Sequence, residues 1–168
     1  MPRLPRAATW AAVAGGAAVL AYPRGLELAL QYNLRRLRAG DPEPLLRFDA
    51  QDVRFRFPGT SSWACELTSK QELRAWLQQF VSIGLELHAD EIVVKGPPWN
   101  TTVCIRCSDS LTAPDGTRVY ENRAVIWGRI AWGLLREYEV YEDTERSLAL
   151  DAWLAAREQP AAVGGGRA

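Results

Sequence analysis

Residues 120–154, YENRAVIWGRIAWGLLREYEVYEDTERSLALDAWL, read as two long strands joined by a tight turn and followed by a helix. Polar and apolar residues alternate along both strands, which is typical of a sheet with one covered face. The alternation stops at Ala131-Trp132-Gly133, where the chain reverses direction, and Asp143 supplies an N-cap for the helix. A helix covering one face of a long hairpin predicts an α+β domain.

The residues upstream predict two helices, a strand, a helix and an antiparallel meander. The helices are expected at 26–38, after Asp41-Pro42, and from a capping box of Ser69 and Glu72 to a stop at Gly84. The expected strands are 53–57, 86–95, 99–109, 118–130 and 134–142, with a loop around Trp63. These elements predict a curved antiparallel sheet packed on three helices, preceded by an N-terminal apolar helix.

Charge and cysteine content narrow the possible functions. The 20 basic and 20 acidic side chains cancel, so no nucleic-acid partner is expected. An odd count of three cysteines in a chain of this size favours a reducing compartment. Cys104 and Cys107 have the spacing of a metal site, but in a strand they point to opposite faces. We therefore expect structural cysteines, no metal site and no cofactor.

Residues 1–25 form a separate hydrophobic segment, in which an uncharged run over 7–22 follows two arginines and precedes Pro23-Arg24-Gly25. Three interpretations stay open: an uncleaved membrane anchor, a cleaved signal peptide and an exposed helical arm. The run is shorter than the about 20 apolar residues of most spanning helices. The arginines that follow it favour a cytoplasmic body. We expect a membrane-anchored protein with a cytoplasmic domain, or a cytoplasmic protein, rather than a secreted one.

Four phrases occur in the order of the predicted elements: RAGDPEPLLRFDAQDVRFRFPG, SKQELRAWLQQFVSIGLE, DGTRVYENRAVIW and YEDTERSLALDAWL. Together they resemble the nuclear transport factor 2-like superfamily, especially its SnoaL-like, or polyketide cyclase-like, branch. The resemblance implies a cone-shaped domain with a deep pocket, placed at residues 26–156, and it implies a homodimer. The glycine-rich residues 157–168 are expected to form a flexible tail. Relatives include ketosteroid isomerases, limonene epoxide hydrolases, polyketide cyclases and domains that only bind or dimerise, so the fold does not select the activity.

The enzymes of this superfamily typically place a carboxylate in the apolar cone. On the last strand, Tyr138, Val140 and Glu142 share one face, and Glu139 lies on the other. With the more apolar set directed inward, Val140 lies where that carboxylate is expected, which argues against the usual acid–base mechanism. A slip of one residue would bring Glu139 inward instead. His88 with Asp90 is another candidate base, for which a half-exposed surface position is the alternative.

The expected pocket lining is mostly aromatic and consists of Trp63, Trp76, Phe80, Trp99, Tyr120, Asn122, Tyr138 and Val140. Tyr120 and Asn122 could orient a ligand, and Trp63 is expected at the pocket mouth. Trp76 and Phe80 lie on a helix stripe that core packing also explains. On the opposite sheet face, Val125 and Trp127 indicate a covered surface, either in a homodimer or under the N-terminal segment.

Three functions remain open from the sequence. The first is a SnoaL-like domain whose apolar pocket binds a small hydrophobic molecule, without a secure catalytic acid. The second is an isomerase, cyclase or hydrolase that uses Glu139, or His88 with Asp90, as its base. The third is a dimerisation module.

Overall fold

The computed structural model describes the backbone of residues 6–158 and the side chains of residues 21–157. Its elements are α1 (Arg6–Arg38), α2 (Glu43–Phe48), β1 (Asp49–Phe57), β2 (Cys65–Leu67), α3 (Lys70–Ser82), β3 (Glu86–Lys95), β4 (Thr101–Thr112), β5 (Arg118–Ala131), β6 (Leu134–Glu142) and α4 (Thr144–Glu158). Most of the tail expected at 157–168 lies outside the described residues.

One curved sheet contains six strands in the order β2-β1-β6-β5-β4-β3. Strands β3 to β6 form the expected antiparallel meander. Strand β1 pairs with β6 in parallel, which departs from the purely antiparallel prediction because this long-range pairing leaves no local trace in the sequence. Strand β2 replaces part of the expected loop, since three residues are too few to show an alternating pattern. The α+β class and the curved sheet are confirmed.

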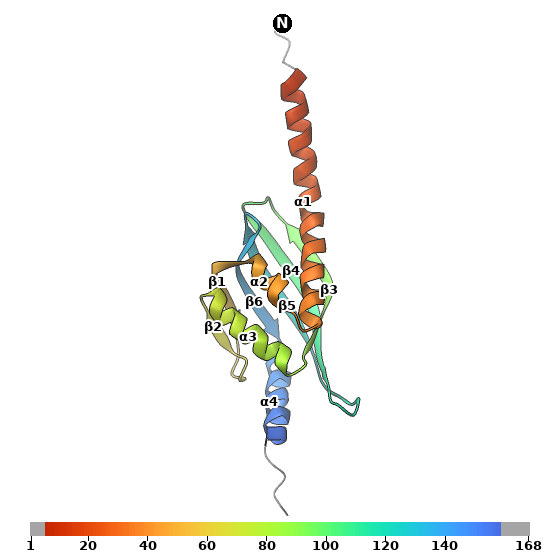
Figure 1. The fold of residues 1–168 in the computed structure, drawn as a ribbon, viewed down its shortest axis with the longest axis vertical. Coiled ribbons are helices and arrows are strands. Elements are labelled where there is room, and N and C mark those ends of the chain that lie inside the picture. The colour runs from red at the N-terminus through yellow and green to blue at the C-terminus, as the bar shows by residue number, and fades with distance from the viewer. Residues whose placement is uncertain (1–5, 159–168) are drawn as a thin grey trace, which may run out of the picture.

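Helices α1, α2 and α3 cover one face of the sheet, and α4 continues from β6 at the end of the domain opposite to the N-terminus (Figure 1). The capping box predicted for α3 is present, because Ser69 Oγ accepts a hydrogen bond from the Glu72 amide at 3.2 Å. Leu73, Leu77 and Phe80 on this helix are buried against the sheet side of the core.

Helix α1 runs without a break through Pro23, although the sequence predicts a boundary there. The first half of α1 projects beyond the sheet (Figure 1), where water can reach the carbonyl that proline leaves without a donor. Next to Pro23, the Tyr22 hydroxyl is 3.1 Å from Thr101 Oγ1, which ties the helix to β4. Among the described helices, none is both long and apolar enough to cross a membrane. The side chains of residues 7–20 lie outside those that the structure describes, so the anchor expected over residues 7–22 stays a prediction.

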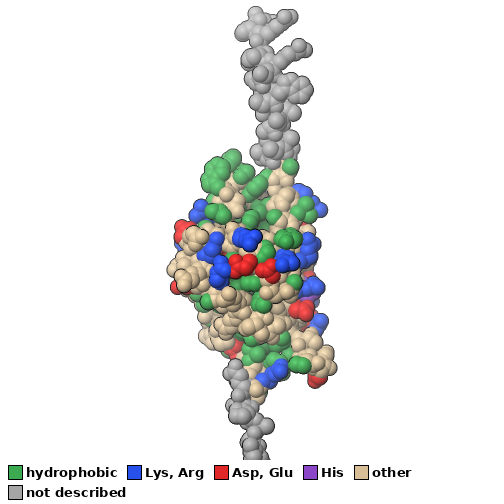
Figure 2. Space-filling model, viewed as in Figure 1, with side chains coloured by type: hydrophobic (Ala, Val, Ile, Leu, Met, Phe, Trp, Pro, Cys, Tyr) green, Lys and Arg blue, Asp and Glu red, His purple; other side chains and the backbone are tan. Residues whose placement is uncertain are grey.

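The core lies between the sheet and the helices. Four leucines of α1 are buried in it, at the spacing that predicted an amphipathic helix: Leu26, Leu30, Leu34 and Leu37. On the face seen in Figure 2, basic and acidic side chains are intermixed across the middle of the domain, with no large field of one sign.

Candidate functional site

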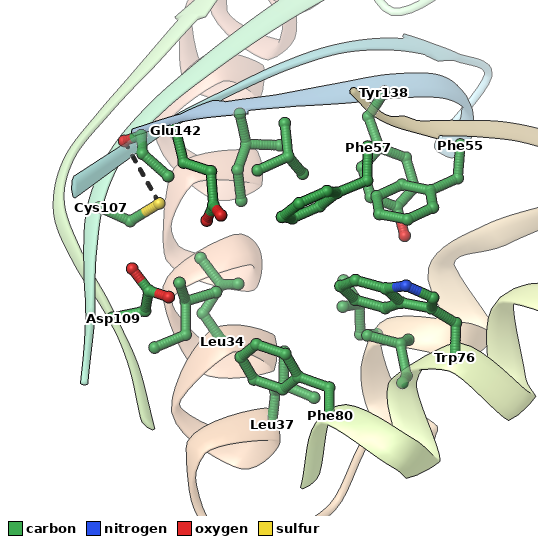
Figure 3. Close-up of a pocket in the computed structure, with 16 residues that line it drawn as sticks. Leu34, Leu37, Phe55, Phe57, Trp76, Phe80, Cys107, Asp109, Tyr138 and Glu142 are labelled. Carbon is green, nitrogen blue, oxygen red and sulfur yellow. Dashed lines mark hydrogen bonds between the residues drawn. The ribbon is translucent and has the colours of Figure 1, made fainter. Parts of the chain in front are cut away.

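A cavity of about 70 Å³ lies between the inner face of the sheet and helices α1 to α3. Its walls are mainly apolar. Five aromatic side chains (Phe55, Phe57, Trp76, Phe80 and Tyr138) and two leucines of α1 (Leu34 and Leu37) form much of the lining. Two carboxyl groups, those of Asp109 and Glu142, also belong to it (Figure 3). The cone is thus an apolar space with one acidic side.

Strand register explains how these acids reach the cavity. Cys107 of β4 is paired with Ala124 of β5, which is paired with Glu142 of β6. These three residues form a row across the inner face, and Asp109 lies on the same face two positions beyond Cys107. Thus the acids come from neighbouring ends of β4 and β6, and α4 begins directly after Glu142.

Burial gives both carboxyl groups a raised pKa. Loss of hydration raises the pKa of Asp109 to about 6, and the neighbouring Tyr120 hydroxyl offsets part of this effect. Burial also raises the pKa of Glu142 to about 7; a hydrogen bond from Ser147 opposes the shift, and the charge of Asp109 adds to it. The cavity lining of the described residues contains no Lys, Arg or His. Near neutral pH, each acid is therefore poised between its protonated and ionised forms.

A buried polar network holds the acidic side in place. The Asn122 side-chain amide donates to the Tyr120 hydroxyl and to the Asp143 carbonyl, each at 3.0 Å. Ser147 Oγ donates to the Glu142 carboxylate and, at 3.1 Å, to the Asp143 carbonyl. Because Tyr120 accepts from Asn122, its own proton remains available for Asp109. The network joins β5, β6 and α4 around the pair.

Two nearby groups are unsuited to nucleophilic chemistry. Burial raises the pKa of the Cys107 thiol to about 12, and Cys107 Sγ donates to the Ala124 carbonyl at 3.5 Å. Burial likewise raises the pKa of Tyr120 above its ordinary value. These groups stay protonated at neutral pH, so acid–base chemistry in this cavity falls to Asp109 and Glu142.

A third buried acid, Asp49, lies outside the cavity lining. Its side chain is enclosed at the start of β1, and neither carboxyl oxygen has a hydrogen-bond partner among the described residues. Burial raises the pKa of Asp49 to about 7, although the charge of Lys70 offsets part of the effect. The Tyr138 hydroxyl is also buried without a partner in the described part of the chain.

The structure brings most of the predicted pocket residues together. Trp76, Phe80, Tyr138 and Val140 line the main cavity. Trp63 and Tyr120 line a smaller space of about 20 Å³ that shares the walls formed by Asp109 and Glu142. Trp63 is buried rather than at a mouth, because it packs edge-on against Trp76 at a centroid distance of 5.9 Å.

Two predicted pocket residues lie elsewhere. Asn122 is buried but belongs to neither wall, and acts instead through Tyr120. Trp99 is half-exposed in the turn before β4, where its ring centroid lies 6.0 Å from that of Trp132. The prediction placed Trp99 on a strand, but β4 begins two residues later, so strand alternation does not apply to it.

The three predicted bases do not line the cavity. Glu139 is paired with Trp127 on the outer face of the sheet and accepts a hydrogen bond from Tyr141, so the proposed register slip does not occur. His88 Nε2 lies 3.5 Å from Glu86, and Asp90 is exposed where the register of β3 shifts. Their positions do not support a role as the base of the cone.

Asp109 and Glu142 were not predicted as site residues, although the sequence carries a signal for both. Alternation from Val103 and Ile105 continues inward through Cys107 to Asp109. The same rule extends the inward face of Tyr138 and Val140 to Glu142. Both acids are found when the inward face of each strand is extended past its last apolar residue.

Comparison with solved structures places this geometry in a known fold. PrhC from Penicillium brasilianum is similar with a TM-score of 0.65 at 18% identity, covering 81% of this chain and 91% of that one. An NTF2-like protein of unknown function from Burkholderia pseudomallei is similar with a TM-score of 0.62 at 17% identity, and the match covers 74% of this chain and 95% of that one. TerC, crystallised with polyporic acid, is similar with a TM-score of 0.58 at 18% identity, and the match covers 78% of this chain and 96% of that one.

The chain therefore has the nuclear transport factor 2-like fold, as the sequence resemblance predicted. No family model matches the sequence, and no curated protein matches it. At these identities the comparisons show the fold alone, and the assignment of an activity rests on the site.

Proposed function

We propose that the cavity binds a small, largely apolar molecule that presents one polar group to Asp109 and Glu142. The observation that carries this proposal is the pairing of apolar walls with two adjacent acids, the arrangement by which pockets combine affinity with orientation. TerC, a protein of similar fold, was crystallised with polyporic acid, which supports a guest in the cone.

The volume limits the guest. An engineered apolar cavity of about 150 Å³ accommodates benzene, whereas this one measures about 70 Å³. The cavity as it stands thus suits a group of a few heavy atoms. A larger guest requires the aromatic side chains of α3, Trp76 and Phe80, to move away from the sheet.

Proton transfer of the isomerase or cyclase type is a second candidate, favoured by one observation. The pKa values of Asp109 and Glu142 are raised to about 6 and about 7. An efficient general acid or base has a pKa near the working pH. The pair can thus supply one proton donor and one acceptor at neutrality, a role that the sequence interpretation assigned to other residues.

Ala124→Leu tests the binding proposal, because Ala124 lines the cavity and a leucine fills it. Val125→Leu is the matched control, since the neighbouring residue lies on the outer face and is exposed. Native mass spectrometry of the purified proteins should detect a bound small molecule in the wild type and in Val125→Leu, but not in Ala124→Leu. Retention of the molecule by a folded Ala124→Leu protein would place the binding site elsewhere.

We further propose that the outer face of the sheet pairs two copies of the chain. Val125, Trp127 and Tyr141 expose large apolar surfaces there, with 39%, 37% and 52% of their areas accessible. Such a patch on a twisted sheet is suited to a symmetric contact.

A further inference from the structure

We infer that the polar group accepted by the cavity is a small organic cation, an alkylammonium. This inference rests on the proposed binding function and names the chemical class of its guest. It draws on the juxtaposition of aromatic rings and carboxyl groups across one small space.

The aromatic side of the cavity is dense. The ring centroid of Trp76 lies 4.8 Å from that of Phe55, and 5.7 Å from each of those of Phe57 and Phe80. In Figure 3 the carboxyl groups of Asp109 and Glu142 lie across the open space from Trp76. A cation in this space meets aromatic rings on one side and acids on the other, the two kinds of surface that attract ammonium groups.

The charge balance of the walls points the same way. The other ionisable groups around the pair are Cys107, Tyr120 and Asp143, each of which is neutral when protonated and negative when ionised, and no basic side chain lines the cavity among the described residues. Asp109 is thus buried and Glu142 half-buried, and neither forms an ion pair with a basic side chain among the described residues. An anionic guest adds like charge, whereas a cation offsets the cost of burying two carboxylates.

The inference can be tested by titrating the full chain with isopropylammonium and with 2-propanol, which have the same shape and differ in charge. Binding is followed by NMR at the Trp76 indole N–H, which donates to the Trp63 carbonyl at 3.2 Å in the wall of the cavity. At pH 8 we expect the ammonium to bind at least about tenfold more tightly than the alcohol, a difference equivalent to one cation–π contact or more.

Lowering the pH provides a second readout. The amine stays charged between pH 8 and pH 5, so any change reports on the protein. If binding requires ionised Glu142, affinity falls about tenfold for each pH unit below its pKa of about 7. Glu142→Gln and Asp109→Asn should each weaken ammonium binding by about tenfold or more. Glu139→Gln, on the outer face of the same strand, is the matched control and should bind as the wild type does.

The outcomes separate this inference from the proposed function. If the alcohol and the ammonium bind equally well, or if the ammonium affinity does not change with pH, the inference of a cationic guest is wrong. The proposal that the cavity binds a small molecule is then unaffected. If neither compound perturbs the Trp76 resonance, the cavity does not take small guests, and both proposals fail. Glu142→Gln and Asp109→Asn each remove a charge from the cavity wall, so both proteins should fold. A dispersed NMR spectrum verifies that each variant is folded.

Discussion

Asp49→Asn should remove a pH-dependent loss of stability. The folded protein holds the pKa of Asp49 at about 7, against an ordinary value of 3.8, because the carboxyl group is buried without partners. One pKa unit corresponds to about 1.4 kcal/mol. The interval between 3.8 and about 7 thus represents up to roughly 4 kcal/mol of stability.

The direction of this change in stability depends on how Asp49 is protonated in the folded and in the unfolded chain. Well below pH 3.8 the carboxyl group is protonated in both folded and unfolded chains, so it adds no pH-dependent penalty. As the pH rises from 4 to 7, the unfolded chain ionises first, and the free energy of unfolding falls; above pH 7 the penalty is constant. Asp109 and Glu142 act in the same direction, so only the difference between wild type and variant isolates Asp49.

Urea denaturation at pH 4 and pH 8 measures this difference. The wild type should lose more stability between the two pH values than Asp49→Asn does, by up to roughly 4 kcal/mol. Asp52→Asn serves as the control, because Asp52 is exposed on the same strand, and it should follow the wild type. Parallel pH profiles for the wild type and Asp49→Asn would refute the assignment of a buried, unpaired acid to this position.

Three further changes test other parts of the structure. Gly96→Ala should lower the free energy of unfolding by about 2 kcal/mol or more, because a Cβ there meets the Asn100 carbonyl at 2.3 Å and φ is +110°; thermal denaturation should show a smaller loss for Gly116→Ala, where the space is open. Ser147→Ala should raise the pKa of Glu142 further, as read by carboxyl ¹³C NMR, because a hydrogen bond is lost. Trp127→Asp should convert a dimer to a monomer in size-exclusion chromatography, and an unchanged dimer would exclude the outer face as the contact.

Local patterns in the sequence were enough to predict most of the elements. The capping box at Ser69, the leucine spacing of α1 and the alternation in β4 to β6 each depend on neighbouring residues, and each has the expected outcome in the structure. The parallel contact between β1 and β6 depends on residues far apart in the chain, and three-residue β2 is too short for a pattern. Neither could be read from local sequence.

The site was harder to predict than the fold because buried acids break the apolar pattern that marks an inward face. Glu142 follows Val140 on the inner face, yet its charge makes it resemble a surface residue. Trp99 shows the reverse error, since a large apolar side chain resembled a core residue but lies exposed in a turn. Pairing partners across strands, rather than residue type, determine which side chains meet in the cone.

The unbroken α1 helix joins a wall of the cone to a segment well outside it. Leu34 and Leu37 face the cavity near one end of the rod, and its other end extends past the sheet. Rotating α1 about its axis by the angle of a single residue, about 100°, would move both leucines away from the cavity and bring their polar neighbours into its wall. The orientation of α1 about its own axis therefore determines whether this wall of the cavity is apolar or polar.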